Sequence, residues 1–177
     1  LKNHDQIQLS ENRQYKELLL NMDYALDNDY PVSESLKALL RPYQAEGFRW
    51  IKTLKQCGFG GILADDMGLG KTLQTLAFLL SEKRDGKTGD SLRTLIITPA
   101  SLVYNWKKEI ARFTPELTCK VLPGTATARQ ELIGPDNDAD IWITSYDLLK
   151  RDIALYEDII FANQIIDEAQ YIKNHST

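Results

Sequence analysis

The chain is organised around one glycine-rich stretch, Gly60-Gly61-Ile62-Leu63-Ala64-Asp65-Asp66-Met67-Gly68-Leu69-Gly70-Lys71-Thr72. Its apolar residues from Ile62 to Ala64 predict the end of a buried strand, and a helix is expected to begin near Lys71. Between them, Gly68 and Gly70 remove side chains where a phosphate would approach backbone N–H groups. The stretch therefore predicts a phosphate-binding turn between a strand and a helix.

Each part of this turn has its own chemistry. Lys71 carries a charge that could reach the β- and γ-phosphates, and Thr72 has a hydroxyl that could bind Mg²⁺. The helix N-terminus adds free N–H groups and the positive end of its dipole. The strict pattern GxxxxGK[ST] is not met, because its first glycine falls on Asp65. The alternative is a glycine-rich turn with an accidental Lys-Thr pair.

Composition limits the class of protein. The 177 residues, 43% hydrophobic and 26% charged, are enough for one domain with a sizeable core. No stretch approaches the roughly 18 apolar residues of a membrane span, and we expect an excised, cytosolic piece. Cys57 and Cys119 belong to no CxxC or Cys/His cluster, so neither disulfides nor zinc are indicated. A net charge of -4 argues against a wholly basic nucleic-acid-binding module but leaves room for a local basic groove.

Strand-like and helix-like segments alternate along the chain. Strands are expected at 62–64, 94–98, 120–122, 141–144 and 161–167. Helices are expected at 10–27, with Ser10 as a possible N-cap, at 42–58, from 71 to the polar loop 83–90, from the N-cap Ser101 to 113, and at 126–133 and 146–156. This alternation predicts an α/β fold, a parallel sheet covered by helices.

Three further side chains are candidates for the same site. Asp167 and Glu168 end the last strand, at the carboxyl edge where parallel α/β sheets form their sites. An Asp there can hold Mg²⁺ and a Glu can orient or deprotonate a water molecule; the alternative is that both only cap the next turn. Gln44, near the start of a helix, could offer a donor and an acceptor to adenine, although such a glutamine is usually just solvated.

Together these segments resemble the first RecA-like lobe of the Swi/Snf-type helicase-like ATPases. The resemblance covers about Leu36 to Thr177. It rests on Leu40-Arg41-Pro42-Tyr43-Gln44, Ile62 to Thr72, Ile97-Thr98-Pro99-Ala100-Ser101-Leu102 with Asn105-Trp106, Ile143-Thr144-Ser145-Tyr146, and Ile166-Asp167-Glu168-Ala169-Gln170 with Ile172-Lys173-Asn174. It implies a RecA-like parallel sheet with helices on both faces, incomplete at its C-terminus. The expected domains are a helical flank, 1–35, and a partial ATPase lobe, 36–177.

The resemblance also implies roles for individual residues. Gln44 would recognise adenine, and Asp167 would bind Mg²⁺ together with Thr72. Of the two catalytic residues, Glu168 would activate water and Lys71 would hold the phosphates with its charge. The triphosphate would be bound by Asp66, Met67, Gly68, Leu69, Gly70, Lys71 and Thr72. The expected DNA contacts, made to the backbone without reading sequence, are Pro99, Ala100, Ser101, Thr144 and Ser145.

The function that this resemblance implies is DNA-stimulated ATP hydrolysis by a translocase on double-stranded DNA, with ATP and Mg²⁺ as cofactors. The expected partners are DNA and a second RecA-like lobe, with no membrane, in the cytoplasm (nucleoid-associated) or the nucleus depending on the source. The fragment alone should bind nucleotide weakly and hydrolyse essentially none. The alternatives are a non-catalytic ATPase-like interaction module and a small P-loop kinase, for which the sequence offers no base or acceptor pocket.

Two residues depart from the family pattern, and one strand is expected to be missing. Asp66 stands where Glu is more usual, and Gln170 replaces the common His after Asp-Glu-Ala. The phosphate-binding turn is called the cradle below. In the family arrangement, the strand after the Asp-Glu motif lies between the strand that precedes the cradle and the strand that ends at Asp167. We therefore expect that slot to be filled by another chain, by a swapped segment, or by direct pairing of the Ile62 and Ile165 strands.

Overall fold

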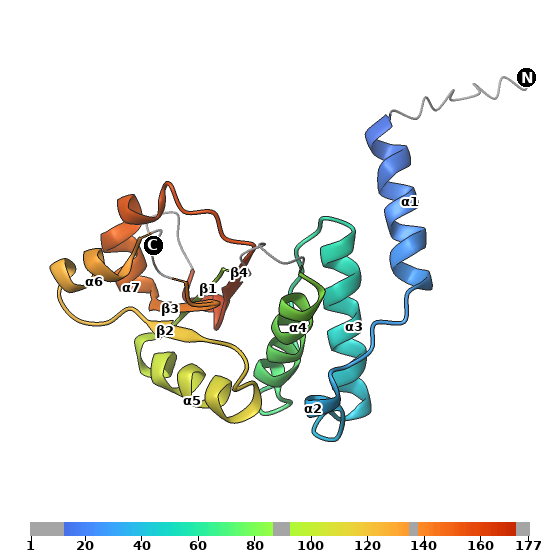
Figure 1. Cartoon of the computed structure of the whole chain (residues 1–177), viewed down its shortest axis with the longest axis horizontal. Helices are drawn as coiled ribbons and strands as arrows, with labels where there is room; N and C mark the ends of the chain where they lie inside the picture. Colours follow the sequence, from blue (N-terminus) through green and yellow to red (C-terminus); the bar gives the residue numbers. More distant parts are fainter. Residues whose placement is uncertain (1–12, 87–92, 135–137, 173–177) are drawn as a thin grey trace, which may run out of the picture.

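The computed structural model describes residues 13–86, 93–134 and 138–172. Its centre is a four-stranded parallel sheet in the order β2-β3-β1-β4 (Figure 1). The strands are β1 (Thr94–Thr98), β2 (Cys119–Val121), β3 (Ile141–Ser145) and β4 (Asn163–Ile166). A short crossover with helical segments precedes each new strand, which is the usual way to make neighbouring strands parallel. The predicted α/β class with a parallel sheet is therefore confirmed.

Helices surround this sheet. They are α1 (Arg13–Asp27), α2 (Glu34–Lys37), α3 (Pro42–Gln56), α4 (Lys71–Asp85), α5 (Val103–Phe113), α6 (Ala126–Leu132) and α7 (Tyr146–Asp152), with short 3-10 turns at Ala100–Leu102, Ile153–Tyr156 and Ala169–Tyr171. Figure 1 shows α5 on one side of the sheet and α6 and α7 on the other, while α3 and α4 stand side by side at one end. None of the described helices is long and apolar enough to cross a membrane.

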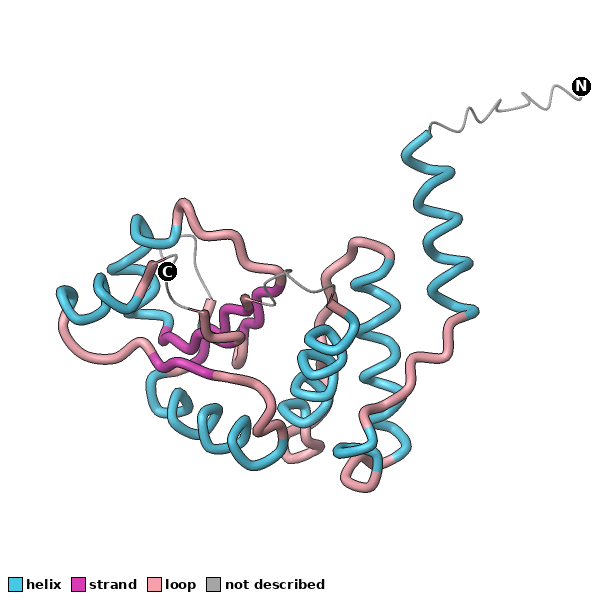
Figure 2. The backbone as a smooth tube through the Cα atoms, in the orientation of Figure 1, coloured by secondary structure: helices cyan, strands magenta, loops and turns pink. Residues whose placement is uncertain are grey.

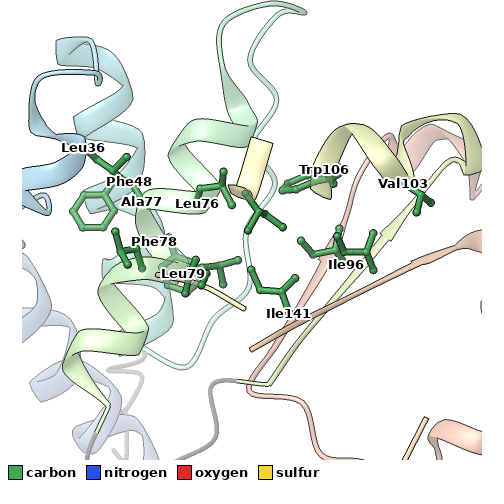
Figure 3. Close-up of a cluster of buried hydrophobic side chains, with 14 residues drawn as sticks. Leu36, Phe48, Leu76, Ala77, Phe78, Leu79, Ile96, Val103, Trp106 and Ile141 are labelled. Atoms are coloured by element: carbon green, nitrogen blue, oxygen red, sulfur yellow. The ribbon is translucent and has the colours of Figure 1, made fainter. Parts of the chain in front are cut away.

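Alternate residues of the central strands supply two separate cores. Ile96 of β1 is fully buried in a cluster with Trp106 of α5 and Leu76 of α4 (Figure 3). Ile143 of β3 belongs to the same cluster and is also fully buried. The neighbouring positions on the same strands, such as Leu95, face the opposite side and pack with residues of α7 and the 3-10 turn after it. Every residue of β1 and β3 is buried. This two-sided burial fits strands covered by helices on both faces.

Helices α3 and α4 are joined by a buried cation. Lys52 of α3 donates to Glu82 at 2.7 Å and to Asp85 at 2.6 Å, both on α4. Burial lowers the pKa of Lys52, but hydrogen bonds to Asp85 and Glu82 outweigh it, and the pKa is raised overall. The ammonium group also lies 5.7 Å from the centre of the Tyr30 ring. The polar loop was predicted at 83–90, but α4 continues through Lys83 and ends at Asp85. Asp85, the last residue of α4, accepts one of the hydrogen bonds from Lys52.

The predicted strand at Ile62 to Ala64 does not form. The chain between α3 and α4 is an open loop in Figure 2, and the Ile62 side chain is 86% exposed. β4 is hydrogen-bonded to β1 and to no other described strand. Direct pairing of the Ile62 and Ile165 segments, one of the three arrangements that we expected, is therefore wrong. A strand is stable only when its N–H and C=O groups find a ladder partner, and no described strand lies beside this loop.

The remaining differences concern helix ends and the N-terminal segment. Ser101 lies inside a 3-10 turn, and its side chain makes no cap bond, so it is not the N-cap of α5. The predicted N-cap Ser10 lies outside the described residues, while α1 itself forms as expected. In Figure 1, α1 leads away from the sheet. The α2 segment, in contrast, buries Leu36 in the core, and the domain boundary at residue 35 stays a prediction.

Candidate nucleotide and DNA site

The phosphate-binding turn lies at the N-terminus of α4. Gly68 and Gly70 have φ angles of +84° and +76°, left-handed values that glycine adopts without strain. Gly70 is the N-cap of α4, so the first N–H groups of this helix have no partner within it. Lys71 Nζ donates to the carbonyl groups of Asp65 at 2.7 Å and Asp66 at 3.1 Å. The lysine therefore lies against the turn in which a phosphate would bind.

The departure at Asp65 has a structural explanation. Its carboxylate accepts a hydrogen bond from Gln74 Nε2 at 2.9 Å, which ties the start of the turn to the first residues of α4. Gln74 is fully buried, and a Cβ at Gly47 of α3 would lie 1.9 Å from its Oε1. An aspartate at this position therefore anchors the turn to α4, where the standard pattern has a glycine.

Helix α3 holds the same turn from its own first residues. Tyr43 Oη and Gln44 Nε2 both donate to the Leu69 carbonyl, at 3.0 and 2.8 Å. Gln44 Oε1 accepts from the Arg41 N–H at 2.9 Å, and Gln44 is buried. Both ends of the Gln44 amide are thus used inside the chain. Recognition of adenine by Gln44 stays a prediction, for which the amide keeps a second N–H on Nε2 and a second lone pair on Oε1.

Asp167 lies one residue beyond β4 and is held by three surrounding side chains. Its Oδ2 accepts from Trp106 Nε1 at 2.8 Å and from Thr98 Oγ1 at 3.0 Å. Its backbone carbonyl accepts from Tyr146 Oη at 2.6 Å. Burial first, and then the carboxylates of Asp167 and Glu168, raise the pKa of Tyr146, which keeps its hydroxyl a donor. No described residue donates to Oδ1 of Asp167, so this atom is available to a metal-bound water.

Glu168 has an unusual backbone. Its φ of 52° and ψ of 51° are left-handed, and it is the one non-glycine residue with positive φ in the described part of the chain. Such conformations cost free energy and gather at functional sites. The Gln170 amide, which replaces the more common histidine, donates to the Glu168 carboxylate. The substitution therefore leaves a donor beside the residue expected to activate water.

The expected DNA contacts gather at the carboxyl edge of the sheet, but they differ in exposure. Ala100 and Ser101 are exposed, whereas Pro99, Thr144 and Ser145 are buried. Ser145 Oγ accepts from the Leu148 N–H at 3.4 Å as the N-cap of α7. Residues of both turns line a hollow of about 160 Å³, together with Tyr104, Pro123 and Gly124. The structure thus brings the two turns together, and their contact with DNA stays a prediction.

The candidate residues form two separate groups. Gln44, Leu69 and Lys71 make up the first, and Asp167 with its three donors makes up the second. Among the described residues, no hydrogen bond or ion pair joins one group to the other. Sequence reasoning missed the hydrogen bonds of Tyr43, Thr98, Trp106 and Tyr146, although each of these residues lies within a motif on which the resemblance rests.

A glycine turn opening a helix, together with an Asp-Glu pair ending a strand of a parallel sheet, is typical of a RecA-like lobe of the P-loop type. The comparisons with known proteins are more specific. The sequence profile of the SNF2-related domain matches residues 43–177. The chain therefore belongs to the SNF2-related family.

Similar proteins come from distantly related organisms. The chain is 44% identical over 138 residues to an uncharacterized ATP-dependent helicase of Mycoplasma pneumoniae, covering 78% of this chain and 13% of that protein. It is 36% identical over 162 residues to the TATA-binding protein-associated factor MOT1 of Saccharomyces cerevisiae, covering 86% and 9%. The SWI2/SNF2 ATPase core of Sulfolobus solfataricus, solved with double-stranded DNA, is 40% identical with a TM-score of 0.71, covering 84% and 30%. The chain thus spans only a small part of these relatives.

Proposed function

We propose that this chain is the first nucleotide-binding lobe of a DNA-stimulated ATPase that translocates on double-stranded DNA. The observation that carries the proposal is the pair of preformed groups on a SNF2-type lobe, the Lys71 turn and the Asp167-Glu168 strand end. The similar Sulfolobus solfataricus core was solved in complex with double-stranded DNA, which supports DNA as a partner. A second RecA-like lobe, which none of the described residues forms, completes the proposed motor.

The residues divide the work as follows. Lys71 and the N–H groups at the start of α4 would bind the β- and γ-phosphates, since both offer positive charge to an anion. Lys71 donates to the carbonyl groups of Asp65 and Asp66, and the third N–H of its ammonium group remains for a phosphate oxygen. Glu168 would orient the attacking water. Gln44 would hold the turn through Leu69 while contacting the base.

Mg²⁺ fits the donor set of this site. Magnesium in nucleotide sites is usually held by one or two protein oxygen ligands, with water and phosphate oxygens completing the shell. The Thr72 hydroxyl and Oδ1 of Asp167 are suited to this role, and Oδ1 receives no hydrogen bond from the described residues. When bound, Mg²⁺ neutralises charge that develops on the phosphates. No described cluster of three His, Cys, Asp or Glu residues competes for it.

DNA would be bound through its backbone, at the carboxyl edge of the sheet. The N–H groups of the exposed Ala100 and Ser101 and the Ser101 hydroxyl suit phosphate oxygens and carry no sequence information. Binding should therefore be salt-sensitive and indifferent to sequence. We place the protein with its DNA, on the nucleoid or in the nucleus according to the source.

The test is ATP hydrolysis by the full-length protein with and without double-stranded DNA. Lys71→Ala and Glu168→Gln should each abolish DNA-stimulated turnover, but only Lys71→Ala should weaken nucleotide binding. Lys37→Ala is the control, because Lys37 is exposed and pairs with Glu34, which is also exposed. DNA-stimulated turnover retained by Glu168→Gln would remove Glu168 from the mechanism. A wild-type protein that binds DNA but neither binds nor hydrolyses ATP would support the non-catalytic alternative.

A further inference from the structure

The hydrogen bonds to Asp167 come from well-separated parts of the chain. Trp106 lies on α5, Thr98 is the last residue of β1, and Tyr146 is the first residue of α7. Trp106 is 4% exposed and Thr98 is fully buried, so neither donor can turn to water if the carboxylate moves away. A buried donor left without a hydrogen bond destabilises the folded state. The carboxylate is therefore held in one orientation, with Oδ2 facing the protein and Oδ1 left open.

The positions of these donors along the chain are informative. Thr98 directly precedes the Pro99 to Ser101 turn, and Trp106 lies on the helix that follows it. Tyr146 directly follows Thr144 and Ser145. Each of the two turns expected to contact DNA is thus covalently next to a side chain that holds Asp167. A displacement of either turn would be transmitted to the backbone or the carboxylate of this one residue.

We infer that Trp106 and Thr98 are positioning residues for the Mg²⁺ site, which orient Asp167 from the DNA-facing edge of the sheet. This inference rests on the proposed function, and it assigns to both side chains a role toward the metal that packing alone does not require. Partners that hydrogen-bond a metal-binding carboxylate fix its orientation, and their loss typically lowers metal affinity by about 10- to 100-fold. Tyr146 holds the backbone of Asp167 in the same way from α7.

The chain provides a matched control for Trp106. Trp142 of β3 is equally buried, at 0% exposed, but its Nε1 has no hydrogen-bond partner among the described residues. Trp106→Phe and Trp142→Phe therefore remove a similar volume from the protein interior, and only the first removes a donor from Asp167. Thr98→Val provides an independent test, because it removes the second donor with little change in side-chain shape.

The experiment measures the Mg²⁺ concentration that half-saturates binding of a fluorescent ADP analogue to the full-length protein. Trp106→Phe and Thr98→Val should each raise this concentration about tenfold, and Trp142→Phe should change it less than about twofold. Binding of the analogue without Mg²⁺ should be the same in all four proteins. Circular dichroism shows whether each variant is folded. If Trp106→Phe fails to fold, the Mg²⁺ requirement of Thr98→Val tests the positioning role.

The outcomes separate the two proposals. If the wild-type protein shows Mg²⁺-dependent nucleotide binding and the Trp106 and Thr98 variants match Trp142→Phe, the positioning role is refuted and the proposed function stands. If the wild-type protein shows no Mg²⁺-dependent binding at all, the proposed function fails and this inference fails with it. A selective rise in the Mg²⁺ requirement of the Trp106 and Thr98 variants supports both.

Discussion

Removing one partner of the buried ion pair between Arg129 and Asp152 should lower the free energy of unfolding by several kcal/mol. Arg129 of α6 donates to Asp152 of α7 through Nε and through Nη2, the latter at 3.0 Å, and Nη1 donates to the Gly124 carbonyl. The side chains are only 4% and 6% exposed. Arg129→Met leaves the Asp152 carboxylate buried without its counter-ion, and breaking a buried pair in this way costs about 3 to 5 kcal/mol. That is a large fraction of the roughly 5 to 15 kcal/mol that stabilise a typical domain.

Replacing both partners should be much less damaging. In Arg129→Met/Asp152→Leu no charge remains buried, and such apolar replacements of buried pairs are often neutral or stabilising. The assay is urea unfolding followed by circular dichroism, applied to both single variants and the double variant. The control is Lys37→Met, which breaks an exposed pair with Glu34 and should cost less than about 1 kcal/mol. A loss of less than about 1 kcal/mol in the free energy of unfolding of Arg129→Met would refute this reasoning. So would a double variant whose loss equals the sum of the losses of the two single variants.

Three other changes test the cradle, the core and a buried phenol. Gly70→Ala should weaken nucleotide binding in a fluorescence titration, because its φ is +76° and the new Cβ would lie 2.3 Å from Gln44 Nε2; Gly134→Ala, where a Cβ meets open space, should not. Leu76→Ala should lower the free energy of unfolding in urea by about 2 to 5 kcal/mol, since this side chain is fully buried. Burial raises the pKa of Tyr156 to about 12 from its usual value of 10. Stability measured by thermal melts should therefore be retained below pH 10 and lost as pH rises toward 12, and Tyr156→Phe should lose less stability over this range than the wild-type protein.

The sheet and its covering helices could be predicted because their patterns are local. β1 and β3 are short apolar runs between turn residues, and α3, α5 and α7 repeat apolar residues at helical spacing. The helical position of Trp106, within α5, was predicted in the same way. Its hydrogen bond to Asp167 was not, because it joins residues 61 positions apart and no spacing rule indicates such a pair. The Arg129–Asp152 and Lys52–Glu82 pairs could not be predicted from the sequence for the same reason.

The false strand at Ile62 to Ala64 illustrates a different limit. Three apolar residues before a glycine turn are typical of a buried strand, yet burial depends on a neighbour that the pattern does not contain. Ile62 is 86% exposed, and Met67, farther along the same loop, is 88% exposed. The glycines and Lys71 still form the turn, because their geometry depends on α3 and α4 alone. The local turn was therefore predicted correctly where the tertiary pairing was not, and phosphate binding by this turn stays a prediction.

The two halves of the site are each held by their own hydrogen bonds, but they are not joined to each other. The cradle is held by Tyr43, Gln44 and Gln74, all on α3 or α4, and Asp167 is held by the strands and helices at the carboxyl edge of the sheet. In the RecA-like arrangement that the resemblance implies, a strand between β4 and the Ile62 segment would fix the spacing of Lys71 from Asp167. That edge of β4 has no described partner, and Ile166 beside it is 47% exposed. The proposed hydrolysis needs both halves on one phosphate, so we expect it to depend on a ladder that joins the loop before α4 to β4.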